Sequence, residues 1–70
     1  MQNIKIMTMN KIKRLERKIA NAKMQLAALE ERKSHLSQHG YWEMGYFKGR
    51  ISVLEDWLDE EKERLENETV

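Results

Sequence analysis

Apolar residues recur at alternating steps of three and four along two stretches of this chain, on either side of a glycine- and aromatic-rich segment at 39–49. Such spacing defines the a and d positions of a heptad and places them on one face of an α-helix. The positions are Ile12, Leu15, Ile19, Ala22, Leu26, Leu29, Lys33 and Leu36 in the first stretch, and Met44, Phe47, Ile51, Leu54, Leu58, Glu61 and Leu65 in the second. The pattern predicts amphipathic helices over 10–38 and 41–67, each with one face in a shared seam.

The heptad frame breaks between 36 and 44, and Gly40 is the expected pivot because glycine adopts positive φ without a steric penalty and often ends helices. A turn at 39–40 sets every a position opposite a d position. The predicted pairs are Leu36 with Met44, Lys33 with Phe47, Leu29 with Ile51, Leu26 with Leu54, Ala22 with Leu58, Ile19 with Glu61, and Leu15 with Leu65. We therefore predict an all-α, coiled-coil-like antiparallel two-helix hairpin over 10–70.

Two segments leave alternatives open. Residues 1–9 are expected to form a flexible or partner-ordered arm, because Ile4-Lys5-Ile6 alternates like a strand that has no partner strand in the chain. Thr8 or Asn10 could cap the first helix, and a helix start around Asn3 is the alternative. Residues 41–49 are expected to be helical, although their two glycines lower helix propensity and leave a longer loop as the competing interpretation.

Composition adds a requirement for association. A single seam in a chain of 70 residues rarely buries enough apolar area for independent stability, and the sequence has no cysteine to form a disulfide. We expect the hairpin to oligomerise, as a homodimer or higher oligomer that completes a four-helix bundle or a larger one. No apolar run reaches the roughly 20 residues that cross a bilayer, so we expect no membrane partner and a cytoplasmic location.

Charge is unevenly distributed. Residues 1–23 carry seven basic and one acidic side chains, and residues 55–70 carry two basic and eight acidic ones. An antiparallel hairpin sets these oppositely charged ends side by side. On one flank of the seam, the e positions, the predicted register pairs opposite charges: Glu30 with Lys48, Lys23 with Glu55, and Glu16 with Lys62. On the other flank, the g positions, it pairs Arg32 with Arg50, Gln25 with Trp57, and Lys18 with Arg64.

Like charges set face to face indicate that something else lies between them. Beside them runs a second apolar stripe, and arginines and aromatics within an apolar patch are typical of interfaces. We therefore predict an interface at Trp57, Val53, Tyr46, Arg50, Arg32, Ala28 and Gln25. It serves either as a self-dimer surface in a purely structural oligomer or as a docking face for another protein.

Nucleic-acid binding is a competing function. The basic residues Lys11, Lys13, Arg14 and Lys18 are candidate phosphate contacts, although a solvated face beside the acidic tail explains them as well. His35 and His39 lie four residues apart, but no cysteine or second acid completes a metal site. We expect no cofactor and no metal. The sequence lacks an activated nucleophile and a phosphate-binding loop, so we expect no enzymatic activity.

The segment Gly45-x-x-x-Gly49-Arg50-Ile51-x-x-Leu54-Glu55-x-x-Leu58 resembles the second helix of many small proteins encoded by bacteriophages and mobile elements. The resemblance covers residues 41–60 and rests on an amphipathic helix that follows a glycine turn. It implies an inhibitor or adaptor that binds a host enzyme or defence complex, in the host cytosol. Together with the predicted interface, it makes a small protein-interaction module the favoured function.

Overall fold

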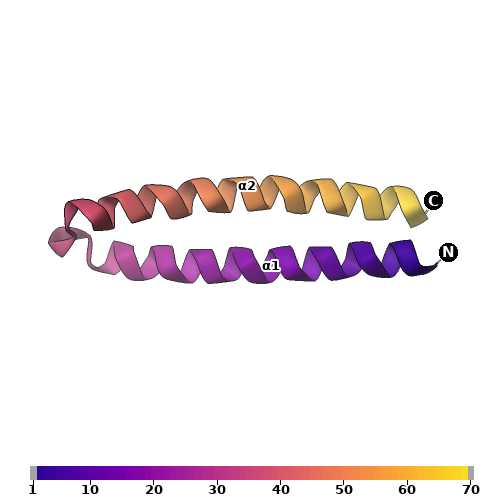
Figure 1. Ribbon diagram of the computed structural model, residues 1–70, viewed down its shortest axis with the longest axis horizontal. Helices are drawn as coiled ribbons and strands as arrows, with labels where there is room; N and C mark the ends of the chain where they lie inside the picture. The colour runs from indigo at the N-terminus through magenta and orange to yellow at the C-terminus, as the bar shows by residue number, and fades with distance from the viewer. Residues whose placement is uncertain (1, 70) are drawn as a thin grey trace.

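The computed structural model describes residues 2–69, with side chains for 4–67, as two long antiparallel helices joined by a short turn (Figure 1). Helix α1 spans Gln2–Glu31, a 3-10 turn η1 spans Lys33–His35, and helix α2 spans Gln38–Thr69. The molecule measures 53 × 14 × 14 Å, so the helices lie side by side over most of their length. The prediction of an all-α hairpin is confirmed. Within the described part, neither helix has a stretch long and apolar enough to span a membrane.

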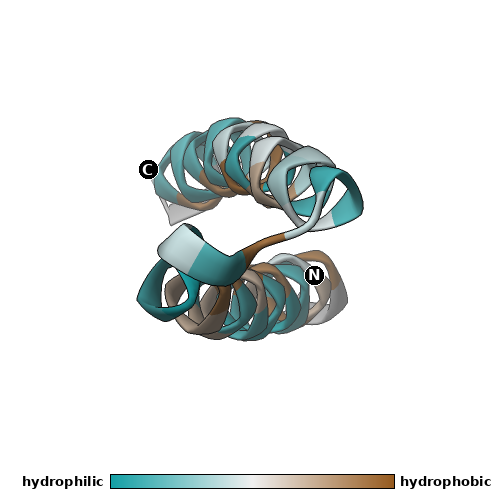
Figure 2. Cartoon of the chain, turned by 90° about the vertical axis from the view of Figure 1, so that its left-hand side faces the viewer, coloured by the Kyte–Doolittle hydropathy of each residue, from teal (hydrophilic) through white to brown (hydrophobic). Residues whose placement is uncertain are grey.

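The core is the predicted seam. Its buried apolar residues all occupy a or d positions: Ile19, Ala22, Leu29, Met44, Ile51 and Leu54. Figure 2 shows the hydrophobic residues of both helices on the sides that face each other. The remaining seam residues are half-buried, apart from Lys33, which is exposed in the turn. The phase of each amphipathic face was therefore predicted correctly from the 3.5-residue repeat.

The turn lies at 32–37, several residues before the predicted pivot, because α1 ends at Glu31 and α2 begins at Gln38. Ser37 directly precedes α2 and caps its N-terminus. Its hydroxyl oxygen accepts a hydrogen bond from the Gly40 N–H at 3.2 Å, and its carbonyl accepts one from the Tyr41 N–H at 3.1 Å. A serine side chain that bonds the third N–H of a helix is an N-cap, and it satisfies a donor that the helix leaves unpaired.

Gly40 is therefore not a hinge. It lies in the first turn of α2, and no described glycine has positive φ. Its contribution is steric, because a Cβ on Gly40 would lie 2.8 Å from Leu36 Cδ2. The absence of a side chain lets Leu36 fold back over the start of α2. Tyr41 holds the other side of the turn, where its hydroxyl donates to the Lys33 carbonyl at 2.8 Å.

The earlier turn displaces the cross-helix register by about one heptad, or roughly 10 Å along the axis. Phe47 and Arg50 line a hollow together with Ala22 and Gln25, whereas the predicted register set Ala22 opposite Leu58. Near the open end, the residues that share a hollow with Leu15 include Trp57 and Glu61. The predicted register is therefore wrong, and Lys33, in the turn, cannot form a layer with Phe47. A seven-residue slip still sets a positions against d positions, so the same residues remain in the core.

Residues 2–9, expected as an arm, belong to α1, which agrees with the alternative of an early helix start. Thr8 explains the extension. It lies seven residues before Leu15, at the next d position of the seam, and only 4% of it is exposed. Its hydroxyl donates to the Ile4 carbonyl at 3.0 Å, so it acts inside the helix rather than as a cap. Residues 41–49 are helical, so the longer loop is not formed.

Candidate protein-docking face

A shallow groove of about 440 Å³ runs along the flank of α2. It is lined by Gly45, Tyr46, Gly49, Arg50, Val53, Leu54 and Trp57. At 3.6 residues per turn, these positions fall on one side of the helix, next to the seam that contacts α1, and Leu54 belongs to both. We call this groove and its rim the docking face. Helix α2 therefore carries two apolar stripes, one buried against α1 and one open.

The docking face exposes large apolar side chains that a monomeric hairpin leaves in water. Tyr46 is 47% exposed, Val53 46% and Trp57 52%. A Cβ added at Gly45 or Gly49 would meet no heavy atom within 4 Å, so the floor between these side chains is open. Large apolar side chains around a hollow floor are the arrangement that hot-spot residues of protein interfaces adopt.

Aromatic rings continue this face toward the turn. The ring centroids of Trp42 and Tyr46 lie 5.7 Å apart with planes at 13°, and Trp42 stacks on His39 at 5.8 Å. Tyr46 also contacts Phe47 edge-on, with ring centroids 5.3 Å apart, so the exposed row of stacked rings is in contact with a seam residue. Such contacts restrict the rings and reduce the entropy that they lose on binding. Trp42, which is 64% exposed, was not among the predicted interface residues. Trp42 lies four residues before Tyr46, on the same side of the helix, and this spacing is the sequence signal that could have placed Trp42 in the predicted interface.

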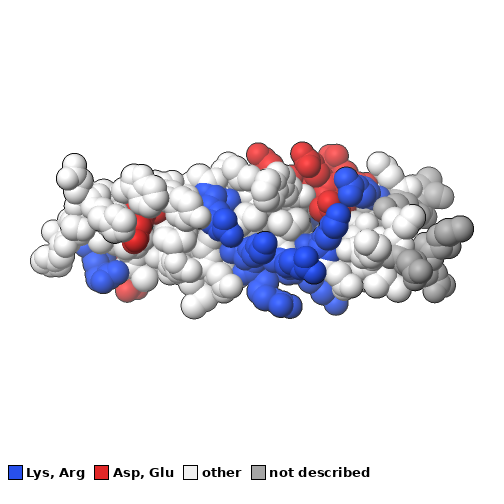
Figure 3. All heavy atoms as spheres, in the orientation of Figure 1, with Lys and Arg blue, Asp and Glu red and all other residues white. Residues whose placement is uncertain are grey.

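Basic side chains border the docking face on the side of α1. Arg50 also lines a second hollow between the helices, together with Lys18, Asn21 and Gln25. Trp57 also lines a third hollow, together with Lys11 and Arg14. Figure 3 shows the face of the hairpin toward which Trp57 projects. On this face, Lys and Arg side chains of both helices gather around the middle, and acidic side chains cover part of α2. Three of the four proposed phosphate contacts therefore lie beside the docking face. Lys13 belongs to a different side of α1, two residues and roughly 200° from Lys11.

The predicted pairing of Arg32 with Arg50, which helped to indicate an interface, is not formed. Arg32 lines a hollow at the turn that it shares with Glu43, and Arg50 lies in the hollow with Gln25. The slip of one heptad is the reason, because it replaces a facing arginine by an acid or an amide. Of the predicted interface residues, Tyr46, Arg50, Val53 and Trp57 come together in the groove, and Gln25 borders it. Arg32 lies at the turn, and Ala28 is exposed on α1.

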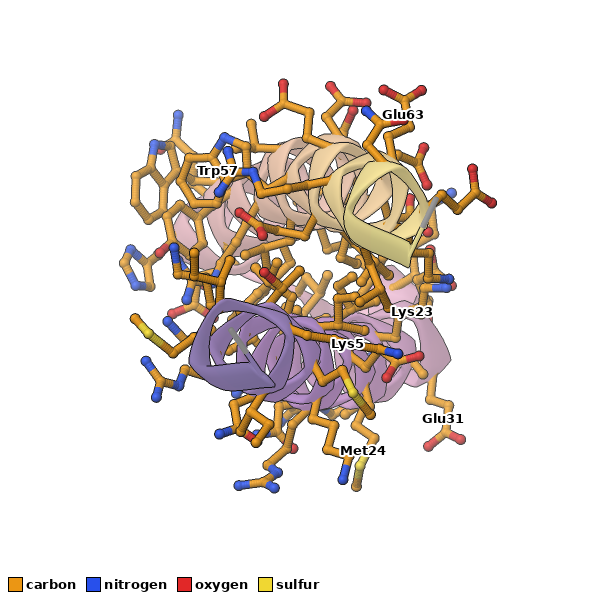
Figure 4. All side chains as sticks on the ribbon, turned by 90° about the vertical axis from the view of Figure 1, so that its right-hand side faces the viewer. Lys5, Lys23, Met24, Glu31, Trp57 and Glu63 are labelled. Atoms are coloured by element: carbon orange, nitrogen blue, oxygen red, sulfur yellow. The ribbon has the colours of Figure 1, made fainter. Side chains whose placement is uncertain are left out.

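The opposite flank contains one predicted cross-helix ion pair, with Lys23 Nζ 3.5 Å from Glu55 Oε2. This pair survives the slip because long helical side chains lean toward the N-terminus of their own helix, so in an antiparallel pair the two lean toward each other. Both are about half exposed, which makes the contact a weak one. Figure 4 shows Lys23 and Trp57 on opposite sides of the hairpin, with Met24 pointing away from α2.

No described group of three or more histidine, cysteine, aspartate or glutamate side chains could hold a metal ion. His39 instead lies next to Glu43, one turn further along α2, with Nε2 3.0 Å from Oε1. These two residues lie at the rim of the turn rather than in the groove.

Comparison with protein-family models, with curated proteins and with solved structures finds no match to this chain.

Proposed function

We propose that the protein is a small protein-interaction module that binds an α-helix of a partner chain on its docking face. The observation that carries this proposal is the open groove in which Tyr46, Val53 and Trp57 are half exposed around two glycines. Apolar patches of this kind on small domains mark interaction sites. An inhibitor or adaptor that binds a host protein, as the sequence resemblance implies, would act through this surface.

A helix fits this groove better than an extended strand or a loop does. The groove follows the axis of α2, and its side chains recur at steps of three and four, which is the spacing that accepts ridges of a second helix. Both hairpin helices already satisfy their backbone hydrogen bonds, so no sheet edge is available for strand addition. A partner helix would also complete a bundle of three or four helices, the form in which such hairpins gain the core that one seam does not provide.

Site-specific photo-crosslinking tests this proposal, because it labels whichever protein occupies the groove. A benzophenone amino acid replaces Val53 in the groove, and a matched control replaces Met24, which is 71% exposed on the far side of α1. In cells that naturally produce the protein, we expect protein adducts from position 53 and few from position 24. Equal labelling at both positions, or none at position 53, would contradict the docking face.

Nucleic-acid binding is a second candidate, and one observation favours it: Lys18 and Arg50 share a hollow with the amides of Asn21 and Gln25, beside the exposed aromatics. Cations with neighbouring aromatic rings suit single-stranded nucleic acid. Fluorescence anisotropy with a labelled oligonucleotide at low and moderate salt tests it. We expect affinity to fall steeply with salt and to weaken for Lys18→Gln if this candidate holds, and no binding at low salt removes it.

A further inference from the structure

We propose that the helix on the docking face is α2 of a second copy of this chain, antiparallel to the first about a two-fold axis beside Gly49. The inference rests on the proposed function and names the partner at that site. It assigns the predicted oligomer a specific contact, α2 against α2, with the two α1 helices outside.

The docking face is complementary to itself about Gly49. Large apolar side chains lie on both sides of this glycine, with Trp42 and Tyr46 toward the turn and Val53 and Trp57 toward the C-terminus. An antiparallel copy with its axis between positions 49 and 50 sets Tyr46 of each copy against Val53 of the other, and Trp42 against Trp57. A two-fold contact requires such reciprocity, in which a surface meets itself and each pair occurs twice.

The glycines allow the two helices to approach closely at the axis. Gly49 lies at the centre of the contact, Gly45 lies one turn away, and both have open space where a side chain would project. The distance between packed helices depends on the side chains at the point of contact, and glycine gives the shortest distance. Arg50 lies at the rim that borders α1, where it shares a hollow with Lys18 and Gln25, so it flanks the contact.

Charge favours the antiparallel orientation over the parallel one. Residues 55–70 carry eight acidic and two basic side chains, so a parallel pair of α2 helices would place two acidic ends together. In the antiparallel pair, the acidic end of each α2 reaches the turn of the other copy. The turn region 32–39 contains Arg32, Lys33, His35 and His39 and no acidic residue. Opposite charges then meet at both ends of the contact.

The alternative dimer, with α1 of one copy on α2 of the other, is less favourable. It would cover Tyr46, Val53 and Trp57 with the α1 edge that carries Lys18, Asn21 and Gln25. That edge offers few apolar atoms to the aromatic groove, and surface ion pairs contribute little in exchange. Contact between two copies of α2 removes the exposed aromatic rings of both chains from water, which is the dominant driving force in association.

Sedimentation equilibrium tests the contact. We expect the 8.4 kDa chain to sediment as a concentration-dependent dimer. Gly49→Leu should raise the dimer dissociation constant at least tenfold, because it fills the groove floor, and it should leave the helix content unchanged, because a Cβ at this position meets no heavy atom within 4 Å. Ser52→Leu, which adds the same side chain on an exposed position of α2 beyond the groove, should leave the dissociation constant unchanged. A monomer at all concentrations, or equal effects of the two variants, would overturn the proposal.

The orientation is tested by pulsed electron spin resonance on nitroxides attached to Ser34→Cys, in the exposed turn. An antiparallel contact centred beside Gly49 places the two turns roughly 40 Å apart, twice the rise from the turn to Gly49 at about 1.5 Å per residue. A side-by-side dimer with both turns at one end gives less than about 25 Å, the width of two hairpins with a packing distance of about 10 Å, and that result would refute the orientation. If the chain is monomeric but Val53 crosslinks to another protein, self-association fails while the proposed function stands. If Val53 gives no crosslink, both fail.

Discussion

Glu61 places a carboxylate in the seam between the two helices, and replacing it by leucine should stabilise the hairpin. Its side chain is 14% exposed, and Oε1 lies 3.3 Å from the Arg64 guanidinium. The other oxygen, Oε2, is buried and has no hydrogen-bond partner among the described residues. A buried acceptor that lost its water without gaining a donor destabilises the folded state.

The change in the free energy of unfolding for Glu61→Leu follows from these contacts. Removal of the unsatisfied acceptor recovers about 1–3 kcal/mol, and a partly buried leucine adds roughly 1 kcal/mol of apolar burial. The lost pair with Arg64 offsets at most about 1 kcal/mol, because the guanidinium is 55% exposed and solvent screens the attraction. We expect Glu61→Leu to raise the free energy of unfolding by about 2 kcal/mol, which corresponds to an increase in Tm of roughly 10 °C.

Urea unfolding followed by circular dichroism, at one protein concentration for all variants, measures this change. Glu60→Leu is the matched control, because Glu60 is the adjacent acid and is exposed. Glu61→Gln, which removes the charge and keeps a polar group in the seam, should fall between the wild type and Glu61→Leu. An unchanged midpoint for Glu61→Leu, or the same gain for Glu60→Leu, would show that the carboxylate is hydrated and that the assigned burial is incorrect.

Three further changes follow from the core and the turn. Leu54→Ala should lower the free energy of unfolding by about 2–5 kcal/mol in urea titrations, since Leu54 is only 3% exposed, whereas Met24→Ala on the far side should be nearly neutral. Ser37→Ala should cost about 1 kcal/mol in the same assay through loss of the N-cap, and Ser52→Ala, in the middle of α2, should not. Tyr41→Phe removes the hydroxyl that donates to Lys33 O, so amide hydrogen exchange should speed up in residues 32–37 and stay unchanged in the centre of α2.

The buried face of each helix could be predicted from the sequence, but the register between the helices could not. A face depends only on the 3.5-residue repeat within one helix, which identified Ile19, Leu29 and Leu54 as core positions. Every slip by seven residues sets a against d again, so periodicity gives several registers of equal quality. The turn selects among them, and a prediction that moved the turn from 32–37 to 39–40 moved all the pairs by about one heptad.

The turn itself carried a readable signal. Glycine is the usual mark of a helix end, and Gly40 drew the prediction to the wrong position. Ser37 is the informative residue, because serine is among the preferred N-caps, and it directly precedes the α2 stretch. Gly40 then follows as the third helical residue, where a side chain would collide with Leu36. The capping preference of serine at position 37 is therefore the sequence signal for the start of α2.

The sequence indicated the docking face through facing like charges, whereas the structure indicates it through an open apolar groove on α2. The predicted pairing of Arg32 with Arg50 is not formed in the observed register, so this pair no longer indicates a partner. What remains is the stripe of Tyr46, Val53 and Trp57, whose phase belongs to α2 alone and therefore survives any error in register. A helix with two apolar stripes on different sides cannot bury both against a single neighbour. One seam buries the first stripe, and the second stays exposed, which is why we propose that another helix packs on the groove of α2.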